Sequence, residues 1–264
     1  MRRVTVYGLF ASLGVAAWAL AVGPVSFSPR QIADLQVAAG RGDAHAHFTL
    51  GQIYEKGLGA KVDLKLALGH FTLSAQRGHS GGEYSAGFFH QMGMGTPKDL
   101  ARALVWYRKA ALHQHSGGMY GVAVFYEEGW ACEKKNPQLA LSWYRRCAAT
   151  GHSGGQYKVA YFLENGIGTP RDPSGALGWY GKSARQGHSG AEYSLGTYYE
   201  DGKFIARDLL TAWKWYWLSA AHGHCGAELK LGSFYERGVL VVRNSVKAKV
   251  WYQRAAAHGC QTGS

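Results

Sequence analysis

The sequence of 264 residues is 47% hydrophobic, which is enough to bury a core and excludes a disordered chain. Its 37 glycines and only 6 prolines, without a Gly-X-Y period, exclude collagen-like and proline-rich classes and favour short packed elements with regular turns. The formal net charge of +12 is typical of proteins that bind nucleic acid or another anionic partner.

The N-terminal segment predicts export. Met1-Arg2-Arg3 is basic, residues 4–22 carry no charge, and Ala19-Leu20-Ala21 fits a small-x-small cleavage site. We therefore expect residues 1–21 to be a signal peptide; the alternative is an uncleaved membrane anchor, because such a stretch can nearly span a bilayer. Either way, the body of the protein is expected outside the cytosol, periplasmic or secreted in a bacterium, or in the ER lumen of a eukaryote.

Residues 22–42 are expected to form a linker and a capping helix. Ser28-Pro29 is typical of a helix start, and Gly40 and Gly42 follow a helical stretch that ends at Ala39. This segment resembles the second half of a helical hairpin whose first half is missing. We expect it to cover the open end of a helical stack.

From residue 43 onward, three landmarks recur with one period, and they divide the chain into six copies at about 43–78, 79–114, 115–151, 152–187, 188–223 and 224–260. Glycines that follow an aromatic position are spaced 36 or 37 residues apart, at Gly57, Gly93, Gly129, Gly166, Gly202 and Gly238. Trp-Tyr pairs begin at Trp106, Trp143, Trp179, Trp215 and Trp251, and Gly-His turns recur in the same phase. A fixed period of this length predicts a helical repeat protein.

Each copy predicts two helices. In the second copy, Ala86, Phe89 and His90 share one face of a helix over residues 83–92, and Gly93 ends it because glycine adopts the left-handed conformation. A second helix is expected over residues 100–113, with small Ala residues that allow close approach and an aromatic pair that fills the space between helices.

The repeated pattern resembles a known family. Leu195-Gly196-x-x-Tyr199-x-x-Gly202, followed by Trp215-Tyr216, Ala220-Ala221 and Gly223-His224, is similar to the Sel1-like repeat, a relative of the tetratricopeptide repeat. The resemblance covers about residues 43–260 and departs from the family pattern at His70, His90 and Leu163. It implies an all-α, right-handed solenoid of six helix-turn-helix repeats that acts as an adaptor without catalysis, and it implies no cofactor.

One sequence motif that is typical of enzymes is better explained by the repeat. Gly78-His79-Ser80-Gly81-Gly82 matches the G-x-S-x-G elbow of serine hydrolases and recurs at Gly151 to Gly155, but no strand is expected before it. We expect the Ser to cap the next helix. The serine-x-x-lysine motif of penicillin-recognising enzymes is absent. A hydrolase or β-lactamase-like enzyme is therefore the least favoured function, and no catalytic residue is assigned.

A ladder of histidines also follows the period, at His79, His115, His152, His188 and His224. Metal ligands must converge within a few ångström, whereas packed helices lie about 8–10 Å apart. One His per copy therefore makes no metal site, and we expect a turn residue near a helix C-terminus, where positive charge is favourable.

The positions of the four cysteines suggest one disulfide bond. Cys225 begins the first helix of the last copy and Cys260 follows its second helix, so an antiparallel hairpin would bring them to one end. A disulfide between them is a hypothesis; loop entropy would contribute about 3–4 kcal/mol. Cys132 and Cys147 are expected to be free or buried thiols.

Three positions on each first helix lie eight, five and one residues before the central glycine, and together they form a stripe that varies between copies. The interior positions beside the stripe stay apolar or small; they are Leu50, Ala86, Val122, Val159, Leu195 and Leu231. The family places the first helices on the concave face, so the stripe is a candidate partner surface. In the second to fourth copies it is partly apolar, and the residues proposed to contact a partner are Phe88, Met92, Val124, Glu128, Lys158 and Tyr161. The alternative is that these residues pack against neighbouring first helices.

Most basic residues fall in the loops and second helices, and the first helices are mildly acidic. The leading prediction is therefore an exported scaffold that binds a protein or peptide on its concave face. The alternative is an envelope protein that binds an anionic glycan, peptidoglycan or a membrane surface through its basic outer face. Nucleic acid is not expected as a partner, because the body of the protein is predicted to lie outside the cytosol.

Overall fold

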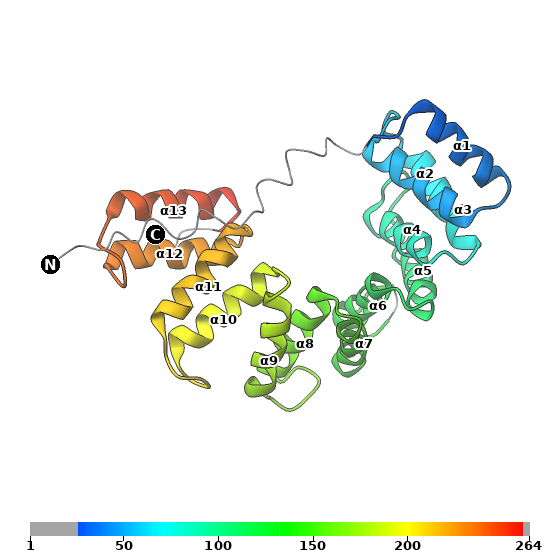
Figure 1. Ribbon diagram of the computed structural model, residues 1–264. Helices are drawn as coiled ribbons and strands as arrows, with labels where there is room; N and C mark the ends of the chain where they lie inside the picture. The colour runs from blue at the N-terminus through cyan, green and yellow to red at the C-terminus, as the bar shows by residue number, and fades with distance from the viewer. Residues whose placement is uncertain (1–25, 132, 261–264) are drawn as a thin grey trace. The chain divides into compact units, whose positions relative to one another are not determined.

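The computed structural model describes residues 26–131 and 133–260, which form helices and loops without a strand (Figure 1). The helices are α1 (Pro29–Gly40), α2 (Ala44–Lys56), α3 (Leu64–Gln76), α4 (Ser80–Met92), α5 (Leu100–Leu112), α6 (Ser116–Glu128), α7 (Pro137–Ala149), α8 (Ser153–Asn165), α9 (Pro173–Ala184), α10 (Ser189–Asp201), α11 (Leu209–Ala221), α12 (Cys225–Arg237) and α13 (Ser245–Ala257). The prediction of an all-α solenoid is confirmed.

The helices group into two compact units. The first unit extends to Pro97 and contains α1 to α4, and the second begins at Lys98 and contains α5 to α13. Within each unit, every helix packs against the next one along the chain. The expected helix after Ser28 is α1, and it packs on α2.

The first helix of a repeat begins earlier than its sequence predicts, and its cap is a histidine. In the second copy, α4 starts at Ser80 rather than at Glu83, and the Nδ1 atom of His79 accepts a hydrogen bond from the backbone N–H of Gly82 at 3.2 Å. The expectation that Ser80 caps this helix is wrong, because Ser80 is already the first helical residue while His79 has the extended backbone of an N-cap. The same cap is made by His115, His152, His188 and His224.

The other helix ends follow ordinary capping chemistry. Each first helix ends at the central glycine of its repeat, for example Gly93 with φ of 72°, a left-handed conformation that side chains with a Cβ adopt at a cost. Each second helix in the repeats begins after an Asp or Asn whose side chain accepts from the first helical turn, as Asp99 does from Arg102 at 2.9 Å. The loops between helices are short because both ends are fixed in this way.

The core is a ladder of aromatic side chains. In the first four Trp-Tyr pairs, the Tyr lies edge-on to a ring of the next first helix, and Tyr144 meets Phe162 with centroids 5.5 Å apart. Tyr216 and Phe234 repeat this contact at 6.2 Å. Such edge-to-face pairs are favourable beyond their buried area, by about 0.5–1.5 kcal/mol each. The aromatic surplus of the sequence is therefore a structural feature of repeat packing.

Candidate functional site

The predicted stripe residues of the first unit lie near the end of α4. Met92 is 57% exposed, whereas Phe88 is half-buried. Both precede the αL glycine Gly93. The exposed thioether and the accessible part of the ring provide an apolar surface on this unit that the buried core does not require.

In the second unit, the stripe residues of α6 and α8 differ in their exposure. Glu128 is exposed, Val124 is half-buried and packs against the core cluster, and Tyr161 is 38% exposed. The ring of Tyr161 stacks near Tyr157 at 6.4 Å. Tyr161 and Glu128 are therefore accessible to a partner, and Val124 contributes mainly to packing.

Lys158 is held in a contact between repeats. Its Nζ atom lies 2.9 Å from Glu127 Oε1, and Glu127 also accepts a hydrogen bond from the hydroxyl of Tyr144. Burial and the carboxylate of Glu127 raise the pKa of Tyr144. The ammonium of Lys158 lies 5.9 Å from the ring centroid of Tyr161. This side chain therefore joins α6 to α8 as well as facing solvent.

The same arrangement returns two repeats later. Glu200 accepts from Lys230 at 2.7 Å and from the Tyr216 hydroxyl at 2.6 Å. Burial would raise the pKa of Glu200, but these hydrogen bonds and the nearby charge of Arg237 lower it below its ordinary value. Glu200 is therefore ionised, and its charge is matched by Lys230.

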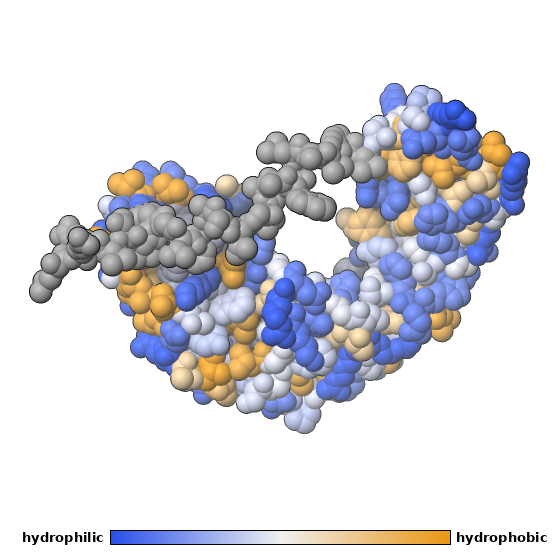
Figure 2. All heavy atoms as spheres, viewed as in Figure 1, coloured by the Kyte–Doolittle hydropathy of each residue, from blue (hydrophilic) through white to orange (hydrophobic). Residues whose placement is uncertain are grey.

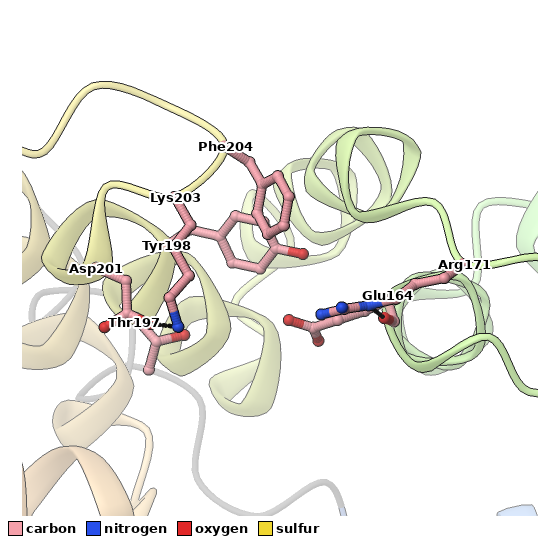
Figure 3. Close-up of a pocket in the computed structure, with 7 residues that line it drawn as sticks. All are labelled: Glu164, Arg171, Thr197, Tyr198, Asp201, Lys203 and Phe204. Carbon is pink, nitrogen blue, oxygen red and sulfur yellow. Dashed lines mark hydrogen bonds and ion pairs between the residues drawn. The ribbon is translucent and has the colours of Figure 1, made fainter.

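Two cavities flank α10 in the second unit. The first, of about 100 Å³, is lined by Glu164 and Arg171 on one side and by Thr197, Tyr198, Asp201, Lys203 and Phe204 on the other (Figure 3). The Lys203 ammonium lies 3.5 Å from Asp201, and Arg171 Nε donates to the backbone carbonyl of Glu164 at 2.8 Å. The charges of this cavity are therefore balanced within it.

The second cavity, of about 160 Å³, repeats the first one 36 residues later along the chain. It is lined by Glu200, Arg207, Leu209, Lys230, Ser233, Phe234, Arg237 and Val239. Lys230, Ser233 and Arg237 are the stripe positions of the last repeat. The stripe thus lines a cavity there, whereas none of the six residues proposed from the sequence lines either of these two cavities.

The sequence contained a signal for these cavities. A Glu stands two residues before the central glycine at Glu127, Glu164, Glu200 and Glu236, and an Arg stands five residues after it at Arg171, Arg207 and Arg243. Charged residues at fixed phase are not needed for an apolar core. Their recurrence indicates polar contacts between successive repeats.

The G-x-S-x-G motifs lie at helix–turn–helix corners. Ser80 and Ser153 are the first residues of α4 and α8, and each is preceded by the capping histidine rather than by a strand. The His ladder is therefore explained by capping. Among the described side chains, no three His, Cys, Asp or Glu residues come together as metal ligands, although His47 and His70 approach within 3.1 Å through their Nδ1 atoms.

The structure joins Cys225 and Cys260 by a disulfide, with Cα atoms 5.7 Å apart. Cys147 is a free, fully buried thiol whose Sγ lies 3.3 Å from the carbonyl oxygen of Ser116. Cys132 and the predicted signal peptide, residues 1–21, lie outside the described residues. Among the helices that the structure describes, none combines the length and apolar character needed to span a membrane.

Comparison with known proteins places these features in a family context. The model of the Sel1 repeat matches residues 44–79, 81–115, 116–152, 153–188, 189–224 and 226–260. No curated protein matches the sequence. A Sel1 repeat protein from Oxalobacter formigenes is 28% identical over 88% of this chain and 93% of its own, with a TM-score of 0.80.

A protective antigen present in uropathogenic Escherichia coli, which displays an SLR fold, is 31% identical over 88% of this chain, with a TM-score of 0.72. The chain spans half of that antigen's length, 50%. An immunity protein from Pseudomonas aeruginosa is 18% identical over 81% of each chain, with a TM-score of 0.54, and shares the fold alone.

Proposed function

The chain belongs to the Sel1 repeat family, whose repeats generally mediate protein–protein interactions, and we propose that this member is an exported, non-catalytic scaffold that binds a protein or peptide partner. The proposed binding surface is the first-helix stripe defined above. Each repeat presents the same first-helix positions, so side chains that the fold does not dictate can differ from one copy to the next.

One observation carries this proposal. The stripe positions change in chemical character between copies while the buried positions beside them stay apolar or small, and in the last two repeats stripe positions line cavities. Val122, Val159 and Leu195 are at most 4% exposed, so the fold accounts for them. It does not account for Tyr161, which is 38% exposed on the same helix as Val159. Exposed aromatic residues are frequent anchors of protein interfaces.

Site-specific photo-crosslinking tests the proposal. Benzoylphenylalanine in place of Tyr161 should form a discrete adduct with a partner in cells, whereas the same group in place of Arg185, exposed at the end of α9, should not. Adducts from the Arg185 position alone would contradict binding through the first helices. Equal adducts from both positions would show contact without a preferred face.

Export is supported by the N-terminal sequence and by the disulfide. The pair Cys225–Cys260 is suited to an oxidising compartment, because cytosolic thiols are kept reduced. N-terminal sequencing of the protein isolated from the cell envelope should begin near Val22 or Gly23. A chain that still begins at Met1 in the envelope would indicate the anchor, and a cytosolic chain would contradict export.

A second candidate function is docking to an anionic membrane surface. Exposed apolar side chains gather over α11 and α13, where Figure 2 shows apolar surface on the visible face; they are Leu210, Trp217, Leu218, Val246 and Val250, each at least 41% exposed. Lys214, Lys247 and Lys249 lie on the same two helices, which carry no acidic residue. Trp, aliphatic and basic residues together are typical of membrane-surface helices.

Vesicle sedimentation distinguishes this candidate from the first. Vesicles rich in phosphatidylglycerol should pellet the protein, and Trp217→Ser should reduce the pelleted fraction. Binding that is equal on zwitterionic vesicles, or unchanged by the substitution, would count against docking through this face.

A further inference from the structure

The two cavities beside α10 are built from the same repeat positions but carry different charges. Thr197 corresponds to Ser233, Tyr198 to Phe234 and Asp201 to Arg237, each 36 residues apart. The fold therefore does not fix the charge at these positions. A difference between equivalent positions of one chain points to a role outside packing.

The first cavity is electrically balanced. It contains the carboxylates of Glu164 and Asp201 and the cations of Arg171 and Lys203. Asp201 and Lys203 form an ion pair with each other at 3.5 Å. An anion entering this cavity would meet a carboxylate for each cation.

The second cavity has an excess of positive charge. Its single carboxylate, Glu200, faces three cations, Arg207, Lys230 and Arg237. Lys230 is already paired with Glu200 at 2.7 Å. Neither Arg207 nor Arg237 forms an ion pair with another residue that the structure describes. Both guanidinium groups are exposed to solvent and are therefore accessible to an anion from outside the chain.

Arg207 is oriented by the same backbone contact that holds Arg171 in the first cavity. Its Nε donates to the backbone carbonyl of Glu200 at 2.9 Å, which uses one edge of the guanidinium and leaves the terminal nitrogens for another acceptor. Arg237, in the last turn of α12, is exposed and close enough to lower the pKa of Glu200. Planar guanidinium groups bind carboxylates through paired hydrogen bonds, which give direction as well as energy.

The floor of the second cavity is apolar. Phe234 is 4% exposed, and Leu209 and Val239 are half-buried. The volume of about 160 Å³ is far larger than the roughly 10–15 Å³ that one water needs. An apolar floor below a cationic rim fits a group with an aliphatic stem and a charged end.

We propose that this cavity, lined by α10 and α12, binds a carboxylate of an acidic peptide segment, through Arg207 and Arg237 at its rim. The proposal rests on the proposed function, since it names the chemistry of the partner that the first-helix stripe receives. The carboxylate belongs either to an Asp or Glu side chain or to the C-terminus of the segment. The first cavity does not take such a group because Asp201 stands where Arg237 does.

Fluorescence anisotropy with defined peptides on the full chain tests this inference. Acetylated octaglutamate amide should bind, and acetylated octaglutamine amide should not. Octaglutamine with a free C-terminus distinguishes the two sources of the carboxylate, since binding of this peptide would assign the site to a chain end. Binding of the glutamine amide as tight as that of the other two peptides would overturn the proposal, and so would a failure of all three peptides to bind.

Matched variants locate the binding. Arg237→Asp, which gives the second cavity the acid of the first, should weaken octaglutamate binding about tenfold or more. Arg145→Asp makes the same change in net charge on an exposed residue of α7 and should have less than about a twofold effect. Equal losses in the two variants would overturn the proposal, because they would show an effect of net charge alone.

The reciprocal change adds a gain of function. Asp201→Arg in the first cavity should strengthen octaglutamate binding, because it reproduces the charge of the second. Arg237→Gln removes one charge without adding an acid and serves if Arg237→Asp lowers the melting temperature. If the photo-crosslink from the Tyr161 position persists while every variant binds octaglutamate alike, the scaffold function stands and this inference fails.

Discussion

The Nδ1 atom of His152 accepts a hydrogen bond from the backbone N–H of Gly155 at 3.1 Å, so an imidazole caps helix α8. This bond requires the neutral ring with its proton on Nε2, because an imidazolium has no acceptor. The ring also lies 5.5 Å from Tyr120 of the preceding first helix. His188 and His224 lie closer to the equivalent rings and stack on Tyr157 and Tyr193, with centroids 4.6 Å apart. The caps therefore connect helix ends to repeat packing.

Stability should fall as the pH is lowered through the range in which these histidines titrate. Burial lowers the pKa of His152, His188 and His224 in the folded chain relative to the unfolded value near 6.5. The unfolded chain then binds more protons, so the contribution of the caps is complete above about pH 6.5 and is lost as the pH falls through the folded pKa values. Melting temperatures measured from about pH 8 to about pH 5 should decline accordingly.

A triple variant isolates the effect. Asn caps helices without titrating, so His152→Asn, His188→Asn and His224→Asn together should keep the caps and flatten the pH profile. His47, His70 and the capping His79, whose pKa values burial also lowers, stay in both proteins and cancel in the comparison. An unchanged slope in the triple variant would disprove the role of the caps.

The ion pair between Lys158 and Glu127 should contribute measurably to stability. Both side chains are mostly buried, with 23% and 19% exposure, and Glu127 also accepts from Tyr144. Lys158→Met keeps the apolar stem but leaves the carboxylate without its cation, at a cost of about 1–2 kcal/mol in the free energy of unfolding. Urea denaturation measures this cost.

The matched control is Lys182→Met. Lys182 is exposed on α9 and lies over the ring of Trp179 at 4.2 Å, so its removal should change the free energy by no more than about 0.5 kcal/mol. If both substitutions lower the free energy of unfolding by the same amount, the ion pair between Lys158 and Glu127 does not stabilise the packing of α6 and α8.

Two glycines in helices should respond oppositely to alanine. A Cβ on Gly196 would lie 2.5 Å from the ring of Tyr216, which is fully buried and fixed by its hydrogen bond to Glu200. Gly196→Ala should therefore destabilise the chain by about 1–3 kcal/mol. A Cβ on Gly178 of α9 meets nothing within 4 Å, so Gly178→Ala should stabilise by about 0.5–1 kcal/mol. Chemical denaturation of both variants checks the signs, and a stabilising Gly196→Ala would contradict the close packing.

The fold could be predicted because its determinants are local and periodic. The αL glycines such as Gly93 and the buried tyrosines such as Tyr144 appear in the sequence at one phase, and each copy supplies the same information again. The sequence predicts a serine cap, because Gly-His-Ser allows either side chain at the first turn. Only the backbone conformation of His79, extended while Ser80 is helical, decides between them.

The cavities could not be predicted in the same way, because each depends on side chains from neighbouring repeats. Arg237 of α12 and Glu200 of α10 line one cavity, although they are far apart in the sequence. The stripe predicts apolar contact residues such as Tyr161, because the fold does not require an apolar side chain at those positions. A cavity with matched and unmatched charges is visible only when side chains of two repeats are placed together.

Alkylation should distinguish the disulfide-bonded cysteines from the free thiols. With Cys225 and Cys260 joined, alkylation of the unfolded, unreduced protein should modify two thiols, and reduction should expose all four. Burial raises the pKa of Cys147 to about 12, outweighing a backbone hydrogen bond to its sulfur, so this thiol should react slowly in the native protein. Mass spectrometry of peptides before and after reduction measures each site. Four modified thiols without reduction would disprove the disulfide.

Truncation of the stripe should weaken partner binding without unfolding the chain. Tyr161 is 38% exposed, so Tyr161→Ala should shift the melting temperature by no more than about 2 °C while it reduces partner capture. Phe88→Ala tests the first unit in the same way, with a larger cost in stability because this ring is half-buried. Affinity capture with crosslinking, read beside calorimetry, separates the two effects. A loss of stability comparable to that of a buried ring, about 3–5 kcal/mol, would make Tyr161 a packing residue and remove it from the binding surface.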